Sequence, residues 1–162
     1  MPTEIERKFL VANADWRARV EGEPLHLRQG YLALTERAVV RVRIADESQA
    51  WLGVKEHRIG PSHGEYEYPI PVPEARELLD LCSGALIDKT RSRVPRGRHV
   101  WEVDEFHGDN AGLVLAEIEL ADADESFDLP VWVGREVTDD RRFYNASLTL
   151  APWPAFADEF RP

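Results

Sequence analysis

The chain has 162 residues, 43% of them hydrophobic, which is enough for one domain with an ordinary core. Its 30 acidic residues outnumber its 20 Lys and Arg residues, and the net charge of -10 argues against general binding to a nucleic-acid backbone. One cysteine cannot form an internal disulfide, and no apolar run approaches the roughly 20 residues that cross a bilayer. We therefore expect a single domain over residues 1–162, without a signal peptide, in the reducing cytoplasm.

Alternating apolar and polar residues predict that most of the chain is β-strand, because successive side chains of a strand point to opposite faces. The first predicted strand, at 3–11, is followed by a short helix at 13–20. Four strands then precede a helix at 72–83, and three more follow it. The strands are expected at 3–11, 26–34, 38–46, 50–57, 64–70, 86–94, 99–106 and 112–120. Short links between most of them imply antiparallel neighbours.

A C-terminal helical segment is expected from about residue 130. Asp139 or Asp140 could cap a helix that runs through Leu148, because an Asp side chain accepts hydrogen bonds from free amides at a helix start. The aromatic residues beyond Pro152 are expected to pack on the surface.

Charged residues share one face of nearly every predicted strand, and many come as pairs of the same sign two residues apart. For a single strand, the ordinary explanation is a sheet with one solvent-exposed face. Like charges along one strand repel, however, so the repetition of this pattern calls for compensating partners. The residues are Glu4, Glu6 and Lys8; Arg41 and Arg43; Lys55; Glu65 and Glu67; Lys89, Arg91 and Arg93; Glu102 and Asp104; and Glu117 and Glu119.

Eight strands suffice to close a barrel whose interior holds side chains or one small ligand. If the charged faces point inward, acids and bases of different strands can meet across the lumen, while helices cover the apolar outer face. Buried charges are costly unless they are paired or bind ions. The predicted fold is therefore α+β: an eight-stranded antiparallel barrel with helices packed on the outside and a charged tunnel inside.

The two kinds of charge suggest different ligands. Carboxylate oxygens suit Mg²⁺ or Mn²⁺, and the residues predicted to hold such an ion are Glu4, Glu6, Glu117 and Glu119. Arg and Lys suit phosphate oxygens, and their number fits a chain of several phosphates; the predicted binders are Lys8, Arg41, Arg43, Lys55, Lys89 and Arg91. Hydrolysis of a phosphoanhydride is the simplest reaction for such a site.

Three roles are open to four further acids: they could orient the bases, hold a second metal ion or help to activate water. Orientation is favoured because bases inside a lumen need partners, and the acids are Glu65, Glu67, Glu102 and Asp104. No Gly-rich phosphate loop or zinc motif is present. The five histidines are expected at the surface or in turns, and Cys82 is expected to pack on an apolar helix face.

The chain resembles the CYTH superfamily of triphosphate tunnel metalloenzymes, especially its short bacterial members. The resemblance rests on Glu-x-Glu-x-Lys at residues 4–8 and extends to about Asn145. The later matching blocks occur in the family's order and read VVRVRI, GEYEYPIP, DKTRSRV, WEVDEF and LVLAEIEL. The chain differs from the family pattern at Glu56, where relatives often have a small residue, and at Ser92, where they often have an aromatic residue.

The resemblance implies an eight-stranded tunnel that binds triphosphate compounds with Mg²⁺ or Mn²⁺. It assigns the metal to the two Glu pairs named above and the phosphates to the six bases. It also implies that Tyr31, which follows Gln29 and Gly30, contacts Lys89 in the tunnel. The implied catalytic set is Lys8, Arg41, Arg43, Lys55, Lys89, Arg91 and Tyr31.

The first functional hypothesis is a metal-dependent hydrolase that cleaves tripolyphosphate to diphosphate and phosphate. A second keeps the tunnel but replaces the substrate by thiamine triphosphate or a nucleoside triphosphate, or the reaction by adenylate cyclisation. An organic group would need apolar or aromatic residues at a tunnel mouth. A third hypothesis is a non-catalytic polyphosphate-binding module. The expected partner is a small triphosphate rather than nucleic acid or membrane, and a homodimer is the assembly considered.

Overall fold

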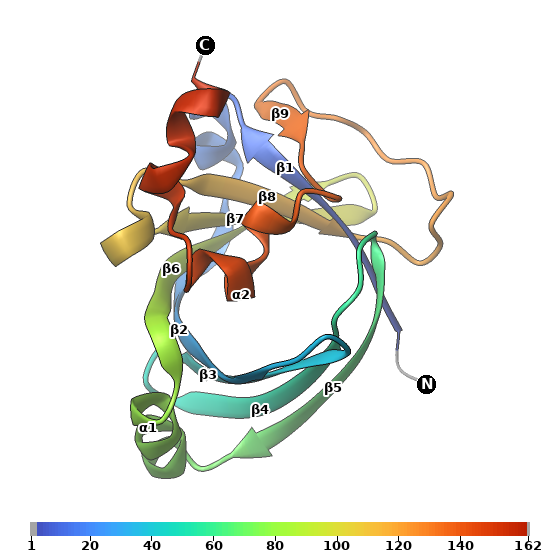
Figure 1. Cartoon of the computed structure of the whole chain (residues 1–162). Helices are drawn as coiled ribbons and strands as arrows, with labels where there is room; N and C mark the ends of the chain where they lie inside the picture. The colour runs from blue at the N-terminus through green and yellow to red at the C-terminus, as the bar shows by residue number, and fades with distance from the viewer. Residues whose placement is uncertain (1–2, 162) are drawn as a thin grey trace.

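A closed β-barrel forms the body of the molecule in the computed structural model, which describes residues 3–161 (Figure 1). Its strands follow the order β5-β4-β3-β2-β6-β7-β8-β1, and β5 pairs with β1 to close the ring. The strands are β1 (Thr3–Val11), β2 (Glu21–Leu34), β3 (Ala38–Ala45), β4 (Gln49–Glu56), β5 (Ser62–Ile70), β6 (Ser83–Arg96), β7 (His99–Phe106) and β8 (Val114–Glu119). The predicted eight-stranded antiparallel barrel is confirmed.

The first strand closes the barrel by pairing on both sides. Glu6 lies opposite Glu119 of β8, and the N-terminal end of β1 pairs with β5, where Glu4 lies opposite His63; both pairings are antiparallel. A short ninth strand, β9 (Val133–Glu136), adds to β1 around Phe9. β9 was not predicted, because four residues are too few to show a clear alternation.

Helices are few and short. The predicted helix at 72–83 is α1 (Val72–Asp80), and the predicted helix at 13–20 is a single 3-10 segment, η1 (Asp15–Arg19). Asp140 caps a 3-10 segment, with its side chain accepting a hydrogen bond from the amide of Arg142, rather than a long helix. The remaining segments are η2 (Gly108–Asn110), η3 (Arg141–Phe143), α2 (Asn145–Leu148), η4 (Trp153–Ala155) and η5 (Ala157–Phe160).

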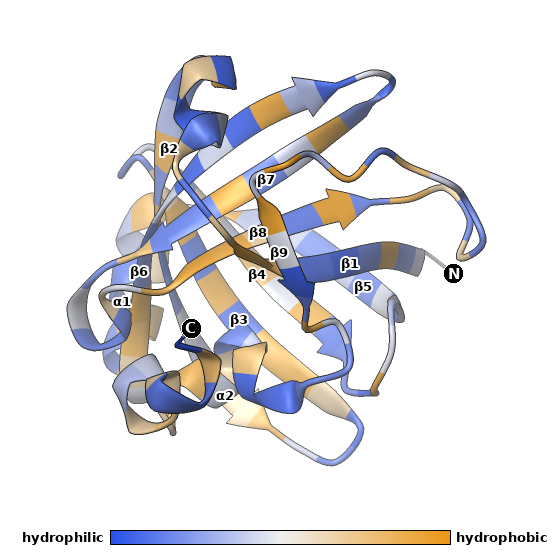
Figure 2. Cartoon of the chain, turned by 90° about the horizontal axis from the view of Figure 1, so that it is seen from above, coloured by the Kyte–Doolittle hydropathy of each residue, from blue (hydrophilic) through white to orange (hydrophobic). Residues whose placement is uncertain are grey.

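Two apolar clusters cover the outside of the barrel. α1 packs Ala75 and Leu79 onto Val42 and Ile44 of β3, which alternate with the inward-pointing arginines. On the opposite wall, η1 and the segment that precedes β9 cover the outer face of β1, β7 and β8, where Trp101 is completely buried. Figure 2 shows the resulting bands of polar and apolar residues along the strands. Across residues 3–161, no helix combines the length and apolar character needed to span a bilayer.

A third cluster lies at one end of the barrel, and the C-terminal segment builds much of it. Phe143, Leu148 and Phe156 pack against barrel residues such as Leu115, which shares the inward face of β8 with Glu117. In Figure 1, α2 and the following segment lie across this end. The last aromatic residues were expected to pack on the surface. Trp153 and Phe160 are partly exposed, but Phe156 is buried, and the three rings surround the fully buried Phe143.

Candidate active site in the barrel

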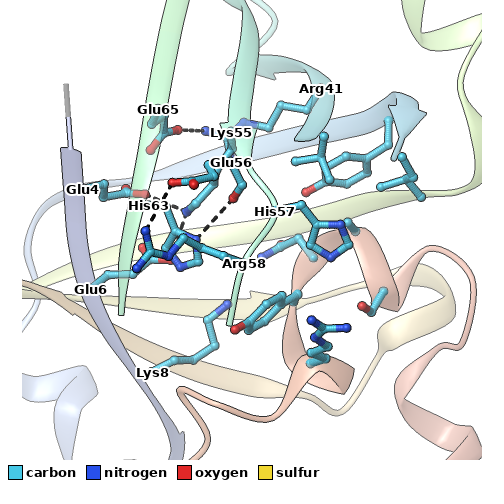
Figure 3. A pocket seen from close by; sticks show the side chains of 18 of the residues that line it. Glu4, Glu6, Lys8, Arg41, Lys55, Glu56, His57, Arg58, His63 and Glu65 are labelled. Carbon is cyan, nitrogen blue, oxygen red and sulfur yellow. Dashed lines mark hydrogen bonds and ion pairs between the residues drawn. The ribbon is translucent and has the colours of Figure 1, made fainter. Parts of the chain in front are cut away.

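A cavity of about 1040 Å³ occupies the barrel, and the predicted site residues line it (Figure 3). Asp104 is the exception, since it lies behind the bases. The predicted residues at the cavity wall are Glu4, Glu6, Lys8, Tyr31, Arg41, Arg43, Lys55, Glu65, Glu67, Lys89, Arg91, Glu102, Glu117 and Glu119. Strand alternation places them there, because every second side chain of a barrel strand points inward. Their roles remain proposals.

Lys55 connects β4 to two carboxylates of β1. Its Nζ lies 2.6 Å from Glu4 Oε2 and 3.2 Å from Glu6 Oε1. Burial opposes ionisation of Glu4, but a hydrogen bond with Glu65 and the charge of Lys55 lower the pKa of Glu4 to about 2. Burial and the hydrogen bond with Glu4 raise the pKa of Glu65 to about 8. Glu65 therefore holds a proton more readily than an exposed glutamate does, and the hydrogen bond joins it to Glu4.

Arg41 binds two acids of β5. Its Nη2 lies 2.8 Å from Glu65 Oε1 and 2.6 Å from Glu67 Oε1. Burial opposes the charge of Arg41, but its contacts with Glu65 and Glu67 raise its pKa. Both acids thus hold the guanidinium in place, as expected for acids that orient bases.

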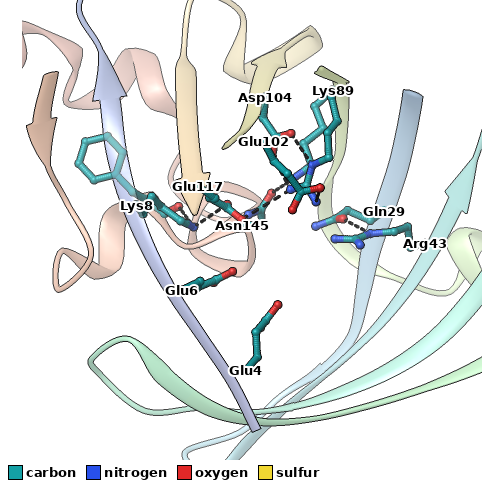
Figure 4. Close-up of polar contacts among 12 residues, drawn as sticks. Glu4, Glu6, Lys8, Gln29, Arg43, Lys89, Glu102, Asp104, Glu117 and Asn145 are labelled. Carbon is teal, nitrogen blue, oxygen red and sulfur yellow. Dashed lines mark hydrogen bonds and ion pairs between the residues drawn. The ribbon is translucent and has the colours of Figure 1, made fainter. Parts of the chain in front are cut away.

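Asp104 organises the bases of β6 from behind the cavity wall (Figure 4). Arg91 donates to both of its oxygens, at 2.7 and 2.8 Å, and Lys89 Nζ donates to Oδ2 at 2.7 Å. Arg91 also donates to Glu102 at 3.1 Å. Lys89 and Asp104 are each only 1% exposed. Burial and the nearby charges of Arg91 and Arg43 outweigh Asp104 and lower the pKa of Lys89 to about 8.

Lys8 ties the C-terminal segment to the cavity. Its Nζ donates to the carbonyl oxygen of Phe143 at 3.3 Å, lies 3.4 Å from Glu117 Oε1, and faces the Tyr144 ring at 5.7 Å from its centroid. On the same segment, Asn145 Oδ1 accepts a hydrogen bond from Lys89 at 3.1 Å. Sequence reasoning missed these C-terminal contributions, because they come from a backbone carbonyl, a ring and an amide rather than from charges in alternation.

Tyr31 points inward, but its hydroxyl is bound differently from the expectation. Tyr31 Oη accepts a hydrogen bond from Gln29 Nε2 at 3.1 Å, whereas Lys89 donates to Asp104 and Asn145. No Tyr31–Lys89 hydrogen bond is present within residues 3–161. Tyr31 is 4% exposed and belongs to the third apolar cluster, around Phe143, which closes one end of the barrel.

Arg43 differs from the other cavity bases in its partners. Its Nε donates to Gln29 Oε1 at 3.0 Å, and within the described part of the chain it forms no ion pair, whereas the five other cavity bases named above each do. Burial and the charges of Arg41 and Arg91 lower the pKa of Arg43 to about 10, so it is still a cation at neutral pH.

The carboxylates predicted to hold a metal ion suit a cation but are not preassembled around one. Within residues 3–161, no three His, Cys, Asp or Glu side chains form a ready-made metal cluster. Glu6 and Glu119 lie directly opposite each other on paired strands, where like charges repel. Burial and the charges of neighbouring acids, Glu117 for Glu6 and Glu4 for Glu119, raise the pKa of each. A divalent cation would relieve this repulsion, so the donor set fits.

Several residues outside the predicted set also line the cavity. Leu34, Val39 and Leu150 supply apolar surface, and the lining bases outside the predicted set include His57, Arg58 and Arg141. His63 lines it as well and is 6% exposed, so the expectation that every histidine lies at the surface or in a turn was wrong for this residue. Burial and the charge of Lys55 lower the pKa of His63.

Comparison with known proteins reveals clear relatives. The CYTH domain model matches residues 2–149. An inorganic triphosphatase of Acetivibrio thermocellus is 43% identical over 159 residues, which cover 98% of this chain and all of that protein. An inorganic triphosphatase of Nitrosomonas europaea is 37% identical over 156 residues, which cover 92% of this chain and 98% of that protein. A crystal structure of an inorganic triphosphatase superimposes with a TM-score of 0.65 at 35% identity, covering 91% of this chain and 97% of that one.

Proposed function

Because the chain belongs to the CYTH domain family, we propose that it is an inorganic triphosphatase that hydrolyses tripolyphosphate to diphosphate and phosphate inside the barrel. The observation that carries the proposal is the convergence of bases and carboxylates from seven of the eight barrel strands on one cavity, to which β2 adds Tyr31. Two relatives named inorganic triphosphatase that match nearly the whole chain support it.

The bases would bind and orient the substrate. The six bases come from four strands, β1, β3, β4 and β6, and line the same cavity, so a chain of phosphates can contact several of them at once. In hydrolysis, a water oxygen bonds to the terminal phosphorus while the bond to the bridging oxygen breaks and diphosphate leaves. Fixed cations would stabilise the charge that grows on the leaving diphosphate.

The enzyme would depend on a divalent cation, for which we propose Mg²⁺ or Mn²⁺. Glu4, Glu6, Glu117 and Glu119 are the residues that would hold it, since their oxygens are the hard ligands that these ions prefer. When bound, the ion would neutralise phosphate oxygens and lower the pKa of a bound water. Lys55 would then exchange its contacts with Glu4 and Glu6 for phosphate oxygens. The lone cysteine fits the cytoplasm as the place of action.

The test is to incubate the purified protein with tripolyphosphate and either metal while phosphate and diphosphate are followed separately. We expect equal amounts of both products, none with a chelator, and almost none from Glu4→Gln. Arg93→Ala is a matched control, because Arg93 lies on β6 but is exposed and does not line the cavity. No release above the Glu4→Gln background would refute the proposal. Binding of tripolyphosphate without turnover would instead support a non-catalytic binding module.

The cavity wall also favours a second substrate class. Leu34 and Leu150 are 37% and 64% exposed and line the cavity, so they could contact an organic group attached to a triphosphate. Nucleoside triphosphates and thiamine triphosphate are the candidates, with adenylate cyclisation as an alternative reaction. Competition assays would separate the two substrate classes. A higher kcat/KM for a nucleoside triphosphate than for tripolyphosphate would make the nucleoside triphosphate the preferred substrate.

A further inference from the structure

Gln29 connects two residues of the cavity wall without lining the cavity itself. Its side chain is completely buried, with 0% exposure. Its Oε1 accepts from Arg43 Nε at 3.0 Å, and its Nε2 donates to Tyr31 Oη at 3.1 Å. The Gln29 amide carries an acceptor and a donor on one uncharged group, so it makes both bonds at once. Figure 4 shows the amide facing Arg43.

We propose that Gln29 is a positioning residue of this enzyme: a neutral clamp that aims the Arg43 guanidinium and the Tyr31 hydroxyl into the cavity while leaving the charge of Arg43 available to the substrate. The inference rests on the proposed triphosphatase function. It adds a residue that touches neither phosphate nor metal and acts only through its two neighbours.

The neutrality of the clamp is the central point. Lys8, Lys55 and Lys89 each bind a carboxylate, so an arriving phosphate must replace an existing ion pair. Arg43 has no such pair within residues 3–161, and its nearest charged neighbours include other cations. Glu67 attracts Arg43 from beyond ion-pair distance, so the guanidinium is only partly compensated; its burial is costly, and a bound anion lowers that cost. Among the six bases predicted to bind phosphate, Arg43 is therefore the one best prepared to attract it.

The strand register fixes this arrangement. Gln29 and Tyr31 lie two residues apart on β2 and so point to the same side, and Gln29 is the direct cross-strand partner of Arg43 on β3. Gly30 lies between them and points outward, where an added Cβ would lie 2.7 Å from Cys82 Sγ and 2.8 Å from Leu86 Cδ2. This close packing of β2 on its outer side holds the clamp at a constant depth in the barrel.

Two substitutions separate positioning from mere packing. Gln29→Met keeps the length but removes both hydrogen bonds, and Gln29→Glu keeps the shape but places a carboxylate on Arg43. We expect kcat/KM for tripolyphosphate to fall roughly 10- to 100-fold in both, the size of one or two lost hydrogen bonds to a charged group. For Gln29→Glu the fall should lie mainly in KM, because Arg43 would be neutralised. The same changes at the exposed Gln49, which does not line the cavity, are the matched controls.

A double-mutant cycle gives the decisive readout. If Gln29 acts through Arg43, Gln29→Met should cause less than about a threefold further loss in an Arg43→Lys background. Full additivity of the two losses would overturn the inference. So would a Gln29→Met protein with a lowered melting temperature but unchanged kcat/KM per folded molecule. An inactive wild-type protein would instead refute the proposed function, and tripolyphosphate binding, measured by calorimetry, would then test the clamp by the same cycle.

Discussion

We predict that the negative charge of Asp104 stabilises the folded protein, because it compensates the buried bases of β6. Replacement by Asn keeps its size but removes the charge that compensates Lys89 and Arg91. Breaking a buried ion pair by removing one partner typically costs about 3–5 kcal/mol. Arg91 keeps Glu102, at 3.1 Å, and Glu117, at 3.6 Å. We therefore expect a loss near the lower limit, about 3 kcal/mol, or roughly 6–12 °C in melting temperature for a chain of this length.

The pH dependence of this loss offers a second check. The folded pKa of Lys89, about 8, lies below its ordinary value of 10.5. Between these values the unfolded chain binds more protons than the folded protein, so the stability of the wild type rises with pH. Asp104→Asn should lower the pKa of Lys89 further. The difference in stability between the two proteins should therefore narrow above pH 8, where Lys89 is neutral in both.

Urea denaturation at pH 7 and pH 9.5 measures both effects. Asp88→Asn is the matched control, because Asp88 lies on β6 next to Lys89 but has a 41% exposed side chain, which pairs with His26 at 2.7 Å. Its cost should be within about 1 kcal/mol, as for other exposed pairs. A loss below 1 kcal/mol for Asp104→Asn, or a loss that is the same at both pH values, would refute the reasoning.

Three further predictions address the pH profile, the closed end of the barrel and the metal. Since Lys89 loses its proton near pH 8, kcat/KM should fall as pH rises through 8. Lys89→Arg should move this fall in kcat/KM to higher pH. A fall at the same pH in the variant would exclude Lys89 as its cause. Phe143→Ala should cost about 3–5 kcal/mol in thermal denaturation, against about 0.5 kcal/mol or less for the exposed Leu129→Ala. Glu119→Gln should weaken Mn²⁺ binding, measured by calorimetry, roughly tenfold or more, while the exposed Glu77→Gln should not.

The sequence predicted the charged wall of the barrel well because charge alternation is a strong signal. Arg41 and Arg43 flank Val42, which is completely buried under α1. The alternation within this one strand therefore indicates both its cavity face and its apolar outer face. The prediction that Glu4, Glu6, Glu117 and Glu119 hold one ion requires the first and last predicted strands to be neighbours, and Glu6 does lie opposite Glu119.

Uncharged contributors could not be predicted in this way. Gln29 follows Leu27 on the inward face of β2, and nothing in a polar amide distinguishes a buried clamp from a solvent-exposed side chain. The aromatic residues that close the barrel have no period of their own, because they lie in 3-10 turns rather than in a regular helix. Their burial depends on contacts with strands far away in the sequence, which local patterns do not report.

The balance of charges in the cavity leads to one more expectation, that substrate and metal bind together. Five of the six bases predicted to bind phosphate are paired with acids, so a triphosphate entering alone would have to compete with these carboxylates. A divalent ion on Glu6 and Glu119 would add positive charge to the cavity and weaken the contact between Lys55 and Glu6. Tripolyphosphate affinity measured without metal should therefore be weak and should rise steeply with Mn²⁺ concentration. Affinity that does not depend on the metal would mean that the bases alone hold the substrate.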